Sequence, residues 1–322
     1  MKKKRVLVCG ATGFIGRNLL EKFSLDSDLE LIGVWHRRPQ FDWHGVEWIR
    51  ADLTNEKDVE HCLKGVDVLI QAAATTSGSK DIVTRPYIHV TDNAVMNSLM
   101  FRAAHDHGVK HVIFFSCSVM YPSSDTPLRE EDFDPGAGIH DRYFGVGWTK
   151  VYIEKMCQFY ARLGKTRYTA IRHSNVYGPH DKYDLERSHV FGATITKVMS
   201  AKDGRILVWG DGTEARDLIH ADDLTRFVRL AIERQTEPFT LCNVGTGHAV
   251  SVKDLVHRIV EASGRSLAIE HDLSKPTIKT TLSLDCTKAR CDFGWEPRIA
   301  LDDGISATID WWRKHIGVAS HG

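Results

Sequence analysis

Residues 5–20 read RVLVCGATGFIGRNLL, and this stretch decides the fold. The apolar run Val6–Val8 predicts a buried strand, three glycines follow at the spacing G-x-x-G-x-x-G, and apolar residues then recur at helical intervals. Gly10 permits a turn that residues with a Cβ resist. Gly13 would let the backbone approach a pyrophosphate, and Gly16 would let the new helix pack closely on the strand. Because the amides of a helix N-terminus favour anions, the stretch predicts a dinucleotide-binding strand–turn–helix.

Composition excludes several classes of protein. The 322 residues include 42 Lys+Arg and 42 Asp+Glu, and the zero net charge argues against binding to nucleic acid or a membrane surface. The basic residues 2–5 lead directly into a strand without the apolar stretch of a signal peptide, and no run approaches the length of a membrane span. Seven scattered cysteines without a C-x-x-C pair suggest reduced thiols in a cytoplasm, with neither disulfides nor a metal site.

The order of predicted elements indicates an α/β protein with a Rossmann-like, doubly wound parallel sheet. Further strands are expected at 29–35, 46–50, 66–71, 112–115 and 168–172, with helices at about 88–107 and 149–163. Ligands of such a sheet bind at the carboxyl ends of its strands. Beyond residue 175 the alternation becomes less regular. We therefore expect a dinucleotide-binding domain at 1–175 and, at 176–322, a smaller interleaved substrate lobe with some segments returning to the main sheet.

The basic residues after the second predicted strand bear on the coenzyme. Arg37 and Arg38 stand where NAD-binding folds place an acidic residue for the ribose 2′-hydroxyl, and a guanidinium suits a 2′-phosphate. NADP is therefore favoured over NAD, and the alternative is a solvated basic turn. Small residues after the fourth strand would let a coenzyme lie against the backbone. The predicted coenzyme contacts in the glycine turn and after the fourth strand are Gly10, Thr12, Gly13, Phe14, Ile15, Gly16, Ala72, Ala73 and Ala74.

Several motifs resemble the extended short-chain dehydrogenase/reductase superfamily, in particular its nucleotide-sugar epimerases, dehydratases and reductases. These motifs are GATGFIG at 10–16, NVYGP at 175–179, and Arg216-Asp217 followed by Asp222-Asp223. The strings YGPHD, SHV and VWG at 177, 188 and 208 are most similar to the GDP-L-fucose synthase branch. The resemblance spans nearly the whole chain. It implies hydride transfer at C4 of a nucleotide sugar, with a 4-keto-6-deoxy GDP-sugar favoured, in a homodimer that pairs the two long helices after the fourth and fifth strands.

The superfamily's proton-transfer residues are only partly present. Its chemistry needs a Tyr, a Lys four residues later that also binds the nicotinamide ribose, and a Ser or Thr after the fifth strand. Lys150 fits the Lys, but Val146 occupies the Tyr position. On one continuous helix Tyr143 would lie about 10 Å from Lys150 along the axis, against about 6 Å for the usual spacing. Gly145 and Gly147 weaken the case for a regular helix, so Tyr143 either reaches the site through a turn or packs at the helix start.

The hydroxyl position is altered as well. It falls on Cys117, which is either an acid/base thiol or a buried inert cysteine. Ser116 and Ser118 flank it and are possible substitutes. The resemblance also implies an epimerising Cys–His pair, of which the Cys position is Val119 while the His matches His189. Only half of that pair is present, unless Cys117 replaces the missing thiol.

For the substrate, Arg216 is the expected contact of the diphosphate, because a guanidinium binds phosphate oxygens bidentately. The alternative is a salt bridge to Asp222 or Asp223. Other substrate or coenzyme contacts implied by the resemblance are Asp52 and Leu53 near the adenine, and Asn175, Ser188, Val190, Lys197 and Trp209 near the nucleotide sugar. Two functions stay open, a reductase or epimerase and a catalytically impaired nucleotide-sugar-binding protein. A 4,6-dehydratase is weaker, because no acidic pair follows the fifth strand.

Overall fold

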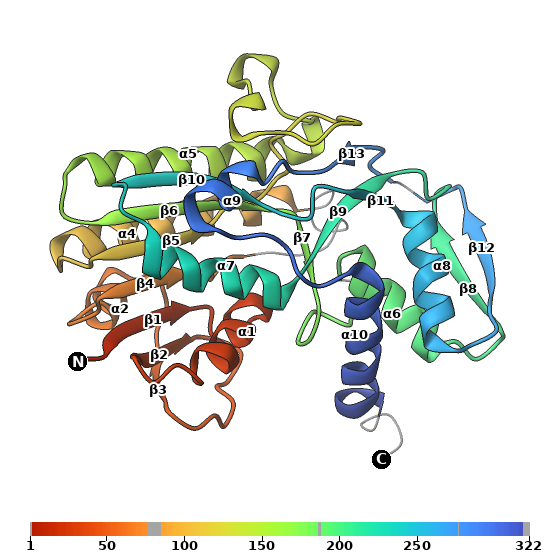
Figure 1. The fold of residues 1–322 in the computed structure, drawn as a ribbon, viewed down its shortest axis with the longest axis horizontal. Helices are drawn as coiled ribbons and strands as arrows, with labels where there is room; N and C mark the ends of the chain where they lie inside the picture. The colour runs from red at the N-terminus through yellow and green to blue at the C-terminus, as the bar shows by residue number, and fades with distance from the viewer. Residues whose placement is uncertain (1, 76–84, 186–187, 276, 318–322) are drawn as a thin grey trace.

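A seven-stranded parallel sheet forms the larger part of the computed structural model, which describes residues 2–75, 85–185, 188–275 and 277–317 (Figure 1). The strand order is β10-β6-β5-β4-β1-β2-β3, with every neighbouring pair parallel. The strands are β1 (Lys4–Cys9), β2 (Leu29–Trp35), β3 (Val46–Arg50), β4 (Val68–Gln71), β5 (His111–Phe115), β6 (Arg167–His173) and β10 (Phe239–Val244). The order reverses between β1 and β4, which confirms the predicted doubly wound sheet and places its ligand-binding switch point beside the glycine turn.

Helices cover both faces of this sheet, so its strands are apolar on both sides. Val6 and Val8 of β1 pack into one core cluster, and Leu7 and Cys9 pack into the other. The first cluster includes residues of α1 (Phe14–Phe23), α7 (Ala221–Arg234) and α9 (Thr287–Phe293). The second includes residues of α2 (Glu56–Cys62), α4 (Thr91–Asp106) and α5 (Phe144–Arg162). The two apolar clusters, one on each face, thus hold the sheet in place, and with it the edge at which the strands end.

A smaller lobe is built from segments after residue 175, while β10, α7 and α9 return to the main sheet (Figure 1). Its apolar core gathers side chains from three helices and the strand β8. These helices are α6 (Val190–Ser200), α8 (Val252–Ser263) and α10 (Leu301–His315). Its strands are β7 (Asn175–Tyr177), β8 (Arg205–Trp209), β9 (Ala215–His220), β11 (Ala249–Ser251), β12 (Ala268–Asp272) and β13 (Thr281–Leu282).

The stretch directly before Lys150 is regular helix, a point that its two glycines left open in the sequence. Helix α5 begins at Phe144, and both Gly145 and Gly147 lie inside it. A Cβ at Gly145 would lie 2.9 Å from Val90 Cγ2, and one at Gly147 would lie 2.9 Å from Ile139 Cδ1. These glycines therefore serve close packing against neighbouring segments rather than helix termination.

Short 3₁₀ turns precede several of the main helices. They are η1 (Pro86–His89), η2 (Glu130–Asp132), η3 (Pro135–Ala137) and η4 (Asp141–Tyr143). η1 replaces the first turn of the helix expected at about residue 88, so α4 starts at Thr91. η4 ends at the N-cap of α5 and thereby places Tyr143 just outside that helix.

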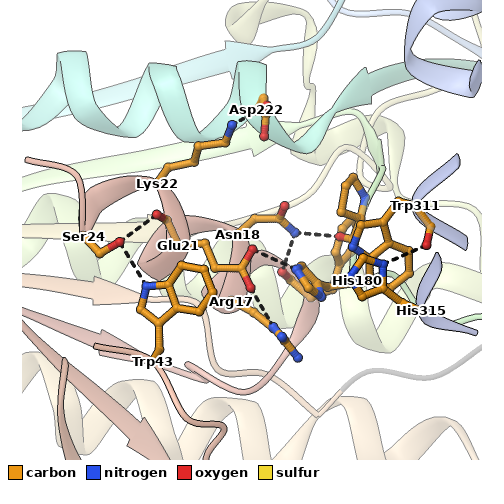
Figure 2. Close-up of polar contacts among 12 residues, drawn as sticks. Arg17, Asn18, Glu21, Lys22, Ser24, Trp43, His180, Asp222, Trp311 and His315 are labelled. Atoms are coloured by element: carbon orange, nitrogen blue, oxygen red, sulfur yellow. Dashed lines mark hydrogen bonds and ion pairs between the residues drawn. The ribbon is translucent and has the colours of Figure 1, made fainter. Parts of the chain in front are cut away.

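The helix that follows the glycine turn is tied to the smaller lobe, as Figure 2 shows. Asn18 Nδ2 of α1 donates to Pro179 O at 2.8 Å, and His180 Nε2 lies 2.9 Å from Glu21 Oε2. The His180 ring packs edge-on against Trp311 of α10, with 4.9 Å between ring centroids. Burial opposes ionisation of Glu21, but the hydrogen bonds from His180 and Arg17 outweigh it and lower the Glu21 pKa. His180 thus links α1 to α10.

Candidate coenzyme and active site

The glycine turn forms an open cradle between β1 and β4. Gly10 has φ +69°, and a Cβ there would lie 2.7 Å from the Cα of Ala73. A Cβ at Gly16 would collide with the carbonyl oxygen of Gly10. Gly13 is the N-cap of α1, and no side chain caps that helix. The first amides of α1 are thus left to an external acceptor, and the cradle fits the pyrophosphate of a dinucleotide.

Arg38 follows strand β2 in the chain, and its side chain reaches the glycine turn. Its Nη1 donates to Thr12 O at 3.1 Å, and Thr12 Oγ1 donates to Arg38 O at 3.3 Å. Arg37 and Arg38 are both exposed. The Asp52 carboxylate accepts from the Thr54 hydroxyl and amide, and these bonds lower its pKa.

The remaining predicted coenzyme contacts fall at the same end of the sheet. Leu53 packs into the core, so only its backbone remains for a ligand. Ala72 and Ala73 are partly buried and Ala74 is exposed, directly after β4. The structure thus places small side chains and backbone groups beside the glycine cradle, as the sequence predicted.

Lys150 is held at the carboxyl end of β5. Its Nζ donates to Phe115 O at 2.6 Å and lies 4.7 Å from the centroid of the Phe114 ring. Burial lowers the pKa of Lys150, while Cys117 and Glu154 oppose that shift. Burial also raises the pKa of the Cys117 thiol, against the effect of the Lys150 charge. A neutral thiol and a lysine ammonium therefore lie close together after β5.

The two serines that flank Cys117 differ in availability. Ser116 Oγ donates to Glu154 Oε1 at 2.6 Å and is buried, so this hydroxyl faces the core and is not free for a substrate. Ser118 is also largely buried, and its carbonyl accepts from Tyr121 N at 3.2 Å. Of the two hydroxyls, only that of Ser116 is bonded to the Glu154 carboxylate among the described residues, so Ser118 is the better candidate for a substrate contact.

Behind Lys150 lies a buried polar network that sequence reasoning missed. Arg172 of β6 donates through Nη2 to Glu154 Oε2 at 2.7 Å, and both side chains are less than 5% exposed, at 3% and 4%. Arg172 Nη1 also donates to Tyr121 Oη at 3.0 Å, and Tyr121 Oη donates to Asn243 Oδ1 at 2.9 Å. The position of Glu154 one turn after Lys150 was the available signal, because an i, i+4 pair shares one helix face.

Tyr143 enters the site from the start of α5, on the side of the smaller lobe. It is the N-cap of the helix and packs on the apolar cluster around Met120 and Ile139. Burial raises its pKa, and the charge of Arg216 opposes this while Cys117 adds to it. Val146 lies one turn before Lys150 in regular helix. Tyr143 therefore lies near Arg216 and Cys117, while the helix position one turn before Lys150 carries no phenol.

Two histidines complete the sheet edge. His189 is the exposed N-cap of α6. His173 is the last residue of β6 and is partly buried. Burial is the main cause that lowers the pKa of His173, to about 4, and the charges of Lys150 and His189 add to it. Sequence reasoning missed His173, although it stands directly between a predicted strand and the NVYGP motif.

Arg216 lies on β9, and its guanidinium donates hydrogen bonds to backbone carbonyls. Its Nη2 donates to Ile278 O at 2.8 Å, and its Nη1 donates to Ala215 O at 2.8 Å. Asp222 pairs instead with Lys22 at 2.8 Å. Asp223 accepts from the backbone amides of Arg298 and Ile299. The alternative of a salt bridge from Arg216 to these aspartates is therefore wrong.

The other predicted substrate residues lie on the smaller lobe. Trp209 is 43% exposed and lies between two ammonium groups, with Lys197 Nζ at 5.7 Å and Lys275 Nζ at 5.9 Å from its ring. Lys197 Nζ also donates to Leu207 O at 2.7 Å. Asn175 Nδ2 donates weakly to Asp217 O, and Ser188 Oγ accepts from Asp184 N at 2.8 Å next to partly buried Val190. Trp209 is thus a surface ring and not part of the core.

The described residues hold neither a metal-binding cluster nor a membrane-spanning helix. Within residues 2–75, 85–185, 188–275 and 277–317, no group of three or more His, Cys, Asp or Glu side chains could hold a metal ion. Over the same part of the chain, every helix is too short or too polar to cross a membrane. All seven cysteines are free thiols.

Comparison with known proteins gives consistent matches over most of the chain. Residues 6–245 match the NAD dependent epimerase/dehydratase family. The chain is 26% identical to the GDP-L-fucose synthase of Escherichia coli, over 98% of both chains. It is 27% identical to the dTDP-4-dehydro-6-deoxy-D-allose reductase of Streptomyces bikiniensis, over 97% of both chains.

Solved structures agree with these matches. MoeE5 in complex with UDP-glucose and NAD is 26% identical and superposes with a TM-score of 0.84, covering 96% of this chain and 99% of that one. The UDP-glucose 4-epimerase of Thermotoga maritima superposes with a TM-score of 0.85 at 24% identity, with the same coverage, and shows the shared fold.

Proposed function

Because the chain belongs to the NAD dependent epimerase/dehydratase family, we propose that it is an NAD(P)-dependent oxidoreductase of nucleotide sugars. It acts at C4 of the sugar, with a 4-keto-6-deoxy sugar nucleotide as the favoured substrate. Two relatives named above act on deoxy sugars joined to GDP and to dTDP, which supports this substrate class. The similarity to fucose synthases favours the GDP-linked form.

One observation supports the proposal: Cys117 and Tyr143 pack against one apolar cluster between the coenzyme edge of the sheet and Arg216. Lys150 is near enough to Cys117 for the two groups to affect each other's pKa. The charge of Arg216 in turn opposes the rise in the pKa of Tyr143. Backbone carbonyls of Ala215 and Ile278 orient the Arg216 guanidinium, and a guanidinium suits a diphosphate. Arg216 would thus place a sugar nucleotide so that its sugar lies between Tyr143 and Lys150.

The coenzyme, when bound, supplies or accepts the hydride at the sugar C4. Lys150 would bind the nicotinamide ribose, with its ammonium oriented by the carbonyl of Phe115. Arg38, fixed over Thr12, would bind a ribose 2′-phosphate, so NADP is favoured over NAD. Tyr143, or a water held by Ser118 or Cys117, remains a candidate for the proton of the sugar oxygen. His189 would serve a neighbouring carbon if epimerisation occurs.

A second candidate is a protein that binds a nucleotide sugar but does not turn it over. The presence of Val146 supports this candidate. This valine stands on regular helix, where the superfamily places its proton-transferring phenol. Purified protein with NADPH or NADH and a panel of GDP- and dTDP-linked 4-keto-6-deoxy sugars tests both candidates, with coenzyme oxidation followed by absorbance. Turnover of any member supports the oxidoreductase. Binding of coenzyme without turnover, together with a large gain of activity in Val146→Tyr, would establish the second candidate instead.

We further propose a homodimer through the outer surfaces of α4 and α5. Among the apolar residues of these helices, Met96, Met100 and Val151 are buried within the subunit. The exposed large apolar side chains of these two helices are Val95, Phe144, Tyr152 and Phe159, and exposed Leu163 follows α5 directly. An apolar strip on two adjacent helices is typical of a subunit interface.

A further inference from the structure

His173 lies at the carboxyl edge of the sheet, near Lys150. It ends β6, the strand beside β5, and its ring packs edge-on against Phe115 with 6.1 Å between centroids. The carbonyl of that same Phe115 accepts from Lys150 Nζ at 2.6 Å. The imidazole and the ammonium are therefore anchored on one residue at the carboxyl ends of two neighbouring strands.

The hydrogen bonding of the ring defines its tautomer. His173 Nδ1 lies 2.7 Å from Ser174 O. A carbonyl oxygen only accepts, so Nδ1 carries the proton, and Nε2 of the neutral ring keeps its lone pair. Among the described residues Nε2 has no hydrogen-bond partner. Nε2 is thus a free base that a fixed carbonyl orients, which is the arrangement of an acid/base histidine.

The charged groups around the ring keep it neutral. Lys150 faces it from α5 and His189 from the start of α6. Together with burial these groups lower the pKa of His173 to about 4, while the bond to Ser174 O favours the protonated form. At neutral pH the ring is therefore neutral, and the imidazolium that would form on taking the substrate's proton keeps its Nδ1–H bond to Ser174 O.

The helix position that normally supplies the phenol carries Val146, which cannot transfer a proton. We propose that His173 is the acid/base residue of this reaction and takes the place of that phenol. This inference rests on the proposed function. In the oxidation direction the sugar O4–H bond breaks and its proton goes to Nε2, while the hydride from C4 goes to an oxidised nicotinamide and the carbonyl forms. In reduction Nε2 returns the proton to O4 as the hydride arrives.

Kinetics of His173→Asn test the assignment. General acid/base catalysis typically contributes about 10²- to 10⁴-fold, so kcat should fall by about 100-fold or more with little change in KM. Fluorescence titration should give an unchanged coenzyme affinity. The matched control is His257→Asn, an exposed histidine on α8, which should retain the wild-type kcat. In wild type the rate of reduction should rise as pH falls from 7 toward 5, and this rise should disappear in His173→Asn.

A rescue separates proton transfer from a structural role. The double variant His173→Asn, Val146→Tyr restores a phenol one turn before Lys150 and should regain at least 10-fold in kcat over His173→Asn. A merely structural histidine would not be replaced by a phenol on another element. Full activity of His173→Asn, with Tyr143→Phe inactive, would overturn the assignment in favour of Tyr143.

A measurement without turnover keeps the two proposals distinguishable. Long-range ¹H–¹⁵N spectra of the free protein, with His173 assigned by its variant, should show the Nδ1–H tautomer and no protonation down to about pH 4. An Nε2–H tautomer, or titration near the ordinary value of about 6.5, would refute the inference even if the protein turns over its substrate. If no sugar nucleotide is turned over, the proposed function fails, and the assignment of His173 as its catalyst fails with it, whatever the spectra show.

Discussion

Removal of the Glu154 carboxylate should strongly destabilise the protein, because it leaves the buried Arg172 guanidinium without its partner. The two side chains are 4% and 3% exposed and meet at 2.7 Å. Burial opposes the charged form of Arg172, but Glu154 outweighs it and raises the Arg172 pKa. Breaking a buried ion pair from one side costs about 3–5 kcal/mol. Loss of the acceptor for Ser116 Oγ adds about 1 kcal/mol.

Glu154→Ala should therefore lose about 4–6 kcal/mol, a large share of the roughly 5–15 kcal/mol by which domains are stable. Urea unfolding followed by circular dichroism measures this loss. The matched control is Asp302→Ala, which breaks the exposed pair of Asp302 with Arg258 at 3.0 Å, with side chains 70% and 39% exposed. Exposed pairs contribute about 0–1 kcal/mol. Equal losses in the two variants would refute the reasoning that burial sets the cost.

Three further predictions concern other parts of the molecule. Arg38→Ser should weaken NADPH binding about 10- to 100-fold relative to NADH, because a charged hydrogen bond contributes about 1.5–3 kcal/mol; fluorescence titration of both coenzymes measures the ratio. Burial lowers the pKa of His111 to about 3, below the unfolded value of about 6.5, so the unfolded state binds more protons and stability falls as pH drops from 6.5 toward 3. His111→Asn should flatten that dependence in unfolding midpoints measured across pH. Phe159→Glu should shift the protein to a lower mass in sedimentation equilibrium if α5 forms the dimer surface, and an unchanged mass would exclude that surface.

The sequence predicted the parts of the site that local spacing defines. The glycine turn between Val8 and Ile15 requires a positive φ and close backbone approaches, and only glycine allows these, so the requirement is written in the sequence. The strands 29–35 and 46–50 were predicted to the residue, because Leu, Ile, Val and Trp make up most of both segments. The carboxyl-end location of the site follows from parallel topology alone.

The sequence left questions open where tertiary packing overrides local preference. Gly145 and Gly147 have low helix propensity and weakened the case for a regular helix. In the structure they are helical because Val90 and Ile139 occupy the space that their side chains would need. Such contacts join segments distant in the chain, and no local window contains both partners.

Val146 and His173 show the same difference between local spacing and tertiary packing, here for catalytic residues. A phenol four residues before a lysine is a local motif, so its loss at Val146 is visible in the sequence. The relation of Lys150 to His173 is instead set by the pairing of β5 with β6, which brings together residues that no fixed spacing relates. Proton transfer requires only that an ionisable atom lie within hydrogen-bond reach of the substrate oxygen, whichever element carries it. The loss of a local catalytic motif therefore does not imply the loss of catalysis when a neighbouring strand ends in a histidine with a free Nε2.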